Sequence, residues 1–483
     1  MAHLYLLELC VAAAILSWYQ VARKPDLVAF FFSFTGLLFL TGMAGILWSG
    51  ITIVRCYLRA QSSRSRLFSL TLAMNLLTVF SLVAMIELTM RLVSTNTIHG
   101  QRLLGTLLLP REWKDIATRY SPAVRKVATE KAYFVYDELL GWAIGPDRSG
   151  EAGRNFSSVE GIRSPRSSLS YREQPVTCRI ALVGDSFTFG DEVAFEESWG
   201  YHLERALHSR CQVLNFGVPG YGVDQAYLRY VRDVRPWHPD VIVFGLINHD
   251  ILRTLSAYSF LIWPDGEIPF AKPRFTISGD RLTLQNVPTP TPERIFSRDS
   301  IKDLPLIQLD VGYHESEWDR PSWQYVHYSY LFRLATTLYP RWEKESEETS
   351  FKTLKAINGS LIKFFVQIAQ AEGSVPLVVY FPDATDYPHP PGFVPNAITM
   401  LREAGIPHID LTPCITALDA SRRFAPQGHY TPEGNLAVAS CLYDNVRLSL
   451  SAKSRISNKA PSSFQDNELI KSVPLNRSSH KST

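Results

Sequence analysis

The sequence lacks the patterns that mark nucleic-acid-binding, nucleotide-binding and metal-binding proteins. Basic and acidic side chains nearly balance over its 483 residues, which leaves a net charge of +3 and no basic stripe. No spacing of Cys and His suits zinc, no P-loop occurs, and no segment is repeated. We therefore expect no nucleic-acid partner, no bound metal and no cofactor.

Charge is scarcest in the first 93 residues, which contain most of the long apolar runs. The runs cover residues 4–21, 27–54 and 67–90, and each is long enough to cross about 30 Å of hydrocarbon as a helix. The first run could instead be a secretory signal, although its small-x-small pattern at 12–14 lies inside the run. We expect about three transmembrane helices and hence a multi-pass membrane protein.

The basic residues near these runs predict the orientation of the chain. Four arginines lie between the second and third runs, whereas only Arg23 and Lys24 lie between the first and second. The positive-inside rule places the arginine-rich loop in the cytoplasm, so everything after Arg91 is expected outside. Glu87 and Arg91 have the spacing of a pair along one helix face.

Cysteine is also scarce, with six residues in the whole chain. Cys178 and Cys211 each directly precede an expected strand, so they would meet at one sheet edge if those strands are neighbours. An oxidising compartment would allow them to join, and Cys414 with Cys441 is a second possible pair. The alternative is that all four are buried free thiols.

The stretch 179–191 organises the rest of the chain. Residues 180–183 predict a strand buried on both faces, Gly184 ends it, and Ser186 follows. A helical pattern begins at Phe195. A hydroxyl residue at the C-terminal end of a buried parallel strand lies where open α/β sheets carry their chemistry. The alternative is that Ser186 only caps the following turn.

The motif Gly184-Asp185-Ser186 resembles the first block of the GDSL, or SGNH, hydrolase family. The segment 424–435 resembles the family's last block, in which a His precedes a turn and a helix. The resemblance covers about residues 175–450, apart from 255–350. It implies a three-layer αβα, flavodoxin-like fold with a parallel sheet, an ester substrate and Ser186 as the nucleophile.

The same resemblance implies two donors to the oxyanion. Gly220, five residues after Asn215, matches the glycine whose backbone N–H serves in the second block. Asn248 matches the side-chain amide of the third block, although its distance from Gly245 is one residue too long; alternatively it caps a loop. A dinucleotide-binding loop is not indicated, because these glycines follow the order Gly-x-x-Gly-x-Gly.

The resemblance implies that His429 is the general base, which takes the proton of Ser186 and returns it to the leaving group. The family usually has an Asp two or three residues before this His, where Gln427 stands here. Gln427 could accept the imidazole N–H without compensating its charge. A Ser-His dyad, or a carboxylate from elsewhere such as Asp410 or Asp250, is the alternative.

We expect four parts in the chain: a membrane region at 1–93, a connector at 94–175, an SGNH hydrolase-like domain at 176–450 and a disordered tail at 451–483. An insertion at 255–350 interrupts the domain. Its aromatic residues could line a sugar or acyl pocket, or could form a small core of the insertion itself.

Together these expectations describe a membrane-anchored, outward-facing serine esterase that acts on an O-acyl ester of a carbohydrate or lipid. An acyltransferase that modifies a cell-surface glycan would use the same serine. A binding or scaffold domain is a third hypothesis, motivated by the missing Asp.

Overall fold

The computed structural model divides into two compact units, Met1–Ile116 with His314–Lys344 and Ala117–Tyr313 with Glu345–Thr483. The predicted insertion at 255–350 is therefore shared between them. The structure describes Ile51, Arg55 and residues 63–456, apart from 98–99, 130–131, 151–152, 263–267, 279–280, 319–323, 339–349, 388 and 390–391.

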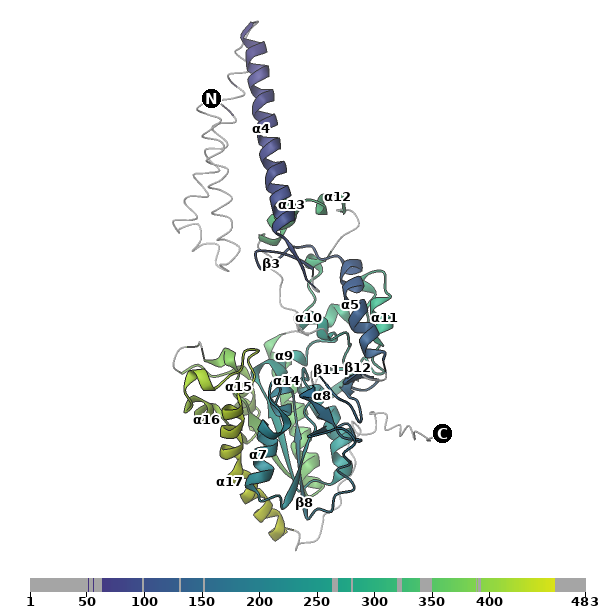
Figure 1. Ribbon diagram of the computed structural model, residues 1–483, viewed down its shortest axis with the longest axis vertical. Helices are drawn as coiled ribbons and strands as arrows, with labels where there is room; N and C mark the ends of the chain where they lie inside the picture. The colour runs from purple at the N-terminus through teal and green to yellow at the C-terminus, as the bar shows by residue number, and fades with distance from the viewer. Residues whose placement is uncertain are drawn as a thin grey trace. The chain divides into compact units, whose positions relative to one another are not determined.

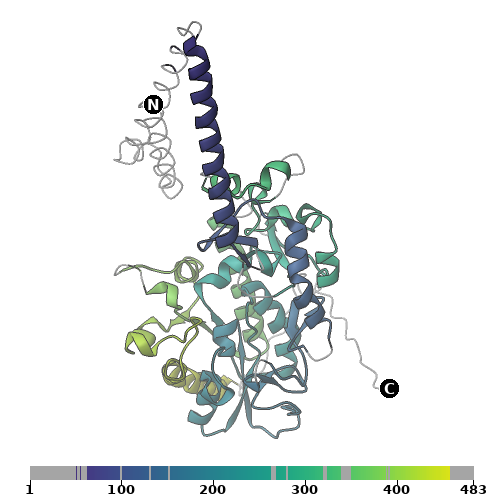
Figure 2. The same cartoon turned by 45° about the horizontal axis from the view of Figure 1, so that its top comes forward.

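In the described part of the first unit, the longest element is the helix α4 (Ser63–Val93), drawn in purple in Figures 1 and 2. A three-stranded antiparallel sheet follows it, formed by β1 (Thr95–Thr97), β2 (Gly100–Leu103) and β3 (Thr106–Leu107). The second segment of this unit adds the short helices α12 (Gln324–His327) and α13 (Tyr330–Leu338).

Glu87 of α4 joins the two segments of this unit. Its carboxylate accepts hydrogen bonds from the backbone N–H groups of Tyr330 at 2.8 Å and Leu331 at 3.0 Å, where α13 begins. A carboxylate at this position satisfies N–H groups that a helix leaves unpaired. Glu87 also pairs with Arg91 at 2.8 Å, which confirms the prediction from their spacing.

One stretch in the described part of the chain, Met74–Val93 of α4, is long and apolar enough to cross a membrane. Its mean hydropathy is 1.9, and none of it is buried within the protein. It overlaps the third predicted run. The first two predicted runs lie outside the described residues.

The second unit is organised around a seven-stranded sheet of order β14-β13-β10-β8-β9-β7-β6. The first five of these strands are parallel, and along the sheet their chain order is the flavodoxin-like 2-1-3-4-5 when read from β9. The last two pair antiparallel, so the sheet is mixed and not wholly parallel as expected. The strands are β6 (Phe156–Ser157), β7 (Arg163–Ser164), β8 (Cys178–Val183), β9 (Cys211–Asn215), β10 (Val241–Leu246), β13 (Val375–Tyr380) and β14 (His408–Asp410).

Helices cover both faces of this sheet in the predicted three-layer arrangement. One face carries α7 (Trp199–Ala206) and α17 (Pro432–Ile456), which lie side by side in Figure 1. The other carries α8 (Val223–Arg229) and α14 (Phe351–Ala371). Successive residues 180–183 alternate between the two faces and are fully buried, as predicted for this strand.

The other elements of the second unit are short. The helices are α5 (Trp113–Val127, which begins in the first unit), α6 (Ser186–Phe189), α9 (Asn248–Arg253), α10 (Ser259–Ile262), α11 (Pro292–Phe296), α15 (Asn396–Glu403) and α16 (Thr412–Thr416). Two antiparallel hairpins are formed by β4 (Phe134–Asp137) with β5 (Gly141–Ile144), and by β11 (Arg274–Ser278) with β12 (Arg281–Gln285).

Two predicted boundaries differ from the structure. Part of the expected connector, β6 and β7, extends the main sheet, because Arg163 pairs with Asn215 of β9. The expected tail begins as helix, because α17 continues to Ile456. Residues 457–483 lie outside the described part of the chain.

Both predicted cysteine pairs are disulfides in the structure. Cys178 and Cys211 are directly opposite in the β8–β9 register, with Cα atoms 4.6 Å apart. Cys414 on α16 and Cys441 on α17 have Cα atoms 6.5 Å apart. The alternative of four free thiols is therefore wrong.

We expect the Cys178→Ser/Cys211→Ser double variant to have a free energy of unfolding about 3 kcal/mol lower than the wild type. The bond closes a loop between residues 33 positions apart, which limits the conformations of the unfolded chain. Urea unfolding of detergent-solubilised protein, followed by tryptophan fluorescence, measures the change. A variant as stable as the wild type would contradict this role.

Candidate active site

The candidate nucleophile stands at the first position of α6, directly after the turn that ends β8. Asp185 caps this helix, because its carboxylate accepts hydrogen bonds from the N–H groups of Phe187 at 3.0 Å and Thr188 at 3.4 Å. A Cβ at Gly184 would lie 2.6 Å from a carbonyl oxygen of β10, so the turn requires glycine. The capping role thus belongs to Asp185, and Ser186 presents a nearly buried hydroxyl.

His429 lies in the turn before α17, and its Nε2 is 2.9 Å from the Oγ of Ser186. The turn is closed by the N–H of Ala425, which donates to the carbonyl of His429 at 2.7 Å. The imidazole packs against Phe187, with ring centroids 5.2 Å apart, and its side chain is 13% exposed. A hydroxyl and an imidazole 243 residues apart in sequence are therefore in hydrogen-bond contact.

Glu192 is the carboxylate partner of this imidazole. Its Oε2 lies 2.9 Å from the Nδ1 of His429 and accepts the backbone N–H of the same residue at 2.9 Å. Its Oε1 accepts the backbone N–H of Gln427 at 2.9 Å. An Nδ1–H donated to this carboxylate leaves the Nε2 lone pair facing the Ser186 hydroxyl.

The backbone conformation of Glu192 explains how a residue so near the nucleophile reaches the histidine. α6 ends at Gly190 in the left-handed region, and Glu192 also has a positive φ of 65°. This double reversal turns the chain back toward the start of α6. The side chain of Glu192 is 8% exposed, so its carboxylate is shielded from water.

Two buried side chains hold this reversed segment. The guanidinium of Arg163 donates to the carbonyls of Gly190 at 2.6 Å and Val193 at 2.7 Å, on either side of Glu192. The amide of Asn215 donates to the carbonyl of Thr188 at 3.0 Å. Burial lowers the pKa of Arg163 to about 10, which still leaves it charged at neutral pH. Arg163, in the part of the chain expected to be a connector, thus supports the site.

The expected role of Gln427 is corrected by these contacts. Gln427 contributes its backbone N–H, and its side chain is exposed and makes no hydrogen bond among the described residues. Asp410 accepts the N–H of Thr412 at 2.8 Å. Asp250 accepts the N–H of Ile247 at 3.0 Å. Among the described residues neither Asp410 nor Asp250 is hydrogen-bonded to His429, whereas Glu192, in the turn after the nucleophile, is.

Three candidate oxyanion donors have no acceptor within the described part of the chain: the backbone N–H groups of Ser186 and Gly220 and the Nδ2 of Asn248. Gly220 is buried with a φ of 83°, between β9 and α8. The Oδ1 of Asn248 accepts the N–H of Ala397 at 3.1 Å. This contact fixes the amide so that its N–H groups remain available to a ligand.

A buried ionic cluster lies directly behind the nucleophile. Arg253 contacts the carboxyl groups of Asp250 at 2.6 Å and Asp185 at 3.6 Å. Burial raises the pKa of Asp250 well above its ordinary value, and the neighbouring Asp185 raises it further. Burial also raises the pKa of Asp185, against the opposing charge of Arg253.

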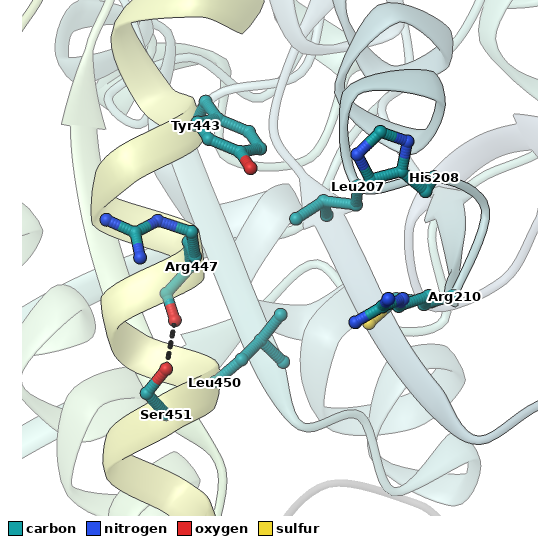
Figure 3. Close-up of a pocket in the computed structure, with 8 residues that line it drawn as sticks. Leu207, His208, Arg210, Tyr443, Arg447, Leu450 and Ser451 are labelled. Atoms are coloured by element: carbon teal, nitrogen blue, oxygen red, sulfur yellow. Dashed lines mark hydrogen bonds between the residues drawn. The ribbon is translucent and has the colours of Figure 1, made fainter.

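A hollow of about 350 Å³ lies at the N-terminal ends of the parallel strands and is separate from these residues. Tyr443 and Arg447 of α17 line it together with His208 and Arg210, which precede β9, and Figure 3 shows Tyr443 directed toward Leu207 and His208. Because β8 and β9 are parallel, the residues before β9 lie at the N-terminal ends of the strands, whereas Ser186 lies at their C-terminal ends.

No family model matches the chain, and no curated protein matches its sequence. Solved structures that are similar to it include a lipase/acylhydrolase from Enterococcus faecalis, with 14% identity, 60% of this chain and 100% of that chain covered, and a TM-score of 0.29. A member of the lipolytic G-D-S-L family from Veillonella parvula has 11% identity, 55% and 96% coverage, and a TM-score of 0.27. A catalytic mutant of an acetylxylan esterase from Geobacillus stearothermophilus has 11% identity, 57% and 96% coverage, and a TM-score of 0.28. The functional interpretation rests on the geometry of the site itself.

Proposed function

We propose that the protein is a serine ester hydrolase of the SGNH type, anchored in a membrane by α4. The observation that carries this proposal is the hydrogen-bonded series Ser186–His429–Glu192, with 2.9 Å at each contact. A hydroxyl, an imidazole and a carboxylate in this order are the parts of a serine nucleophile activated by a general base.

The reaction that fits these groups is acyl transfer through a covalent intermediate. The Oγ of Ser186 attacks the ester carbonyl while the Nε2 of His429 takes its proton. The alkoxide then leaves with that proton, so an acyl-serine and a free alcohol are formed. Water attacks the acyl group by the same route and releases the acid, and the carboxylate of Glu192 stabilises the imidazolium in both halves.

The hypothesis of a binding domain was based on the missing Asp near His429. Glu192 provides a carboxylate in its place, so this reason no longer applies. Acyl transfer to a glycan shares every step up to the acyl-serine. Competition between water and a sugar acceptor for the acyl group distinguishes that reaction from hydrolysis.

Two features support an anchored domain outside the cytoplasm. The stretch Met74–Val93 has the length and composition of a membrane span, and its exposed apolar surface needs an apolar environment. The disulfides Cys178–Cys211 and Cys414–Cys441 are typical of oxidising compartments. Fractionation of the full chain and protease protection of the second unit test this location.

The proposed function is tested by labelling the detergent-solubilised full chain with a fluorophosphonate probe. We expect a single adduct on Ser186, found by peptide mass spectrometry and absent from Ser186→Ala. Folded protein in which Ser186 is not labelled would overturn the proposal, because an activated buried serine reacts with such probes through its oxyanion site.

Asn248→Ala is expected to lower kcat by about 100- to 1000-fold and to change KM little, because the amide acts mainly on the charge that develops in the transition state. Hydrolysis of p-nitrophenyl acetate measures both constants. Asn248→Asp preserves the size of the side chain but presents a carboxylate to the oxyanion, so it should be at least as slow. Wild-type rates in both variants would remove Asn248 from the oxyanion site.

A further inference from the structure

A second imidazole–carboxylate pair lies at the same sheet edge and is not used by the proposed mechanism. The Nδ1 of His249 is 3.1 Å from the Oδ2 of Asp383. The side chain of Asp383 is only 6% exposed, whereas that of His249 is 51% exposed. The pair therefore has a fixed, buried acid and an imidazole open to a ligand.

The order of the strands places this pair beside the site. β8, β10 and β13 are neighbours, and at their C-terminal ends they carry Ser186, His249 and Asp383 in that order. The hydroxyl of Tyr430, next to His429, donates to the carbonyl of Pro382 at 2.7 Å. A hydrogen bond therefore connects the residue after His429 with the residue before Asp383.

The segment 383–397 is attached at both ends to the start of α9. Asp383 contacts His249, and the N–H of Ala397 donates to the Oδ1 of Asn248 at 3.1 Å. These contacts hold His249 and the preceding residue, the candidate oxyanion donor Asn248, in place, and about half of the His249 side chain is exposed.

The environment of Asp383 determines which nitrogen of His249 donates a hydrogen bond and which can accept one. Burial alone would raise the pKa of Asp383, but hydrogen bonds from His249 and Thr385 hold it below its ordinary value. The carboxylate also accepts the N–H of Thr385 at 2.7 Å, so it is ionised and rigid. It takes the Nδ1–H of His249 and leaves Nε2 as an acceptor, which has no partner among the described residues.

We infer that His249, positioned by Asp383, accepts a hydrogen bond from a free hydroxyl of the substrate beside the scissile ester. The inference rests on the proposed ester hydrolysis and adds a specificity determinant to it. The preferred substrates are then esters of alcohols that carry a second hydroxyl near the acyl group. An ester that lacks this hydroxyl leaves the exposed Nε2 of His249 to water and so loses this contact with the protein.

The test compares two substrates that differ in one group: a monoacetylated methyl glucoside and its deoxy analogue, which lacks the hydroxyl next to the acetyl group. With the detergent-solubilised full chain, we expect the wild type to prefer the hydroxylated ester by about tenfold in kcat/KM. His249→Ala should reduce this ratio to about one. His249→Gln, whose amide oxygen can reach the position of Nε2, should restore part of it.

The matched control is His208→Asn at the N-terminal ends of the parallel strands, which should keep the wild-type preference. His208 has a φ of 55°, and asparagine tolerates that conformation. A wild-type ratio retained in His249→Ala would overturn the inference, whether both rates fall together or neither changes. A wild type without Ser186-dependent turnover of p-nitrophenyl acetate would overturn the proposed function, and the inference with it.

Discussion

Ser186→Ala is expected to lower kcat for p-nitrophenyl acetate by roughly a millionfold, to near the rate set by substrate binding and the oxyanion donors alone. The Oγ of Ser186 is the atom in contact with the Nε2 of His429, and alanine removes it without creating a new charge. Stopped assays with long incubation times measure the residual rate against a protein-free blank.

His429→Ala is expected to lower kcat about as much, and the double variant no further, because nucleophile and base act as a unit. Circular dichroism of each variant checks that the fold is retained. Two independent losses that multiply in the double variant would show that Ser186 and His429 do not act in one step.

Glu192→Gln is expected to lower kcat by roughly ten-thousandfold. Glutamine has the length of glutamate and adopts the same positive φ at equal cost, so the turn is retained while the charge is lost. The uncharged amide no longer stabilises the imidazolium of His429, nor does it enforce the tautomer that leaves Nε2 free to take the proton. Rates measured from pH 6 to 9 show whether the loss persists across the titration range of histidine.

Two matched variants distinguish this role from general damage to the turn. Asp191→Asn changes the adjacent carboxylate, which accepts the N–H of Glu192 at 3.0 Å and can still do so as an amide oxygen. Gln427→Ala removes an exposed side chain but keeps the backbone N–H that binds Glu192. Both variants should retain near wild-type kcat. If Gln427→Ala is inactive while Glu192→Gln is active, the side chain of Gln427, and not Glu192, is the partner of the imidazole.

Much of the fold was predictable because its signals are local. The apolar run at 180–183, between Cys178 and Gly184, identifies a strand buried on both faces, and the structure gives it that place. The helical pattern that begins at Phe195 agrees with a 3-10 turn at Phe195–Glu197 followed by α7, Trp199–Ala206. The antiparallel β6 and β7 were not predictable, because each is only two residues long and their attachment to the sheet depends on the pairing of Arg163 with the distant Asn215.

Only the site residues that lie in recognisable family motifs were predictable from the sequence. Ser186 and His429 lie in recognisable blocks, and the structure brings them together. Glu192 was missed because its role depends on a left-handed turn and on the carbonyl contacts of Arg163, which sequence spacing does not reveal. The pair of His249 with Asp383 depends on β10 lying next to β13, and so appears only in three dimensions.

The position of Glu192 places the acid and the histidine on separate segments of the chain. The nucleophile and the acid lie on one short segment, 186–192, so the local backbone conformation of that segment sets the distance between them. The loop that delivers His429 contributes the imidazole and the backbone N–H groups of Gln427 and His429 that bind Glu192, so its side chains can vary as long as that backbone geometry is kept. Substitutions in this loop that keep those two N–H groups in place are therefore expected to keep the acid in contact with the imidazole.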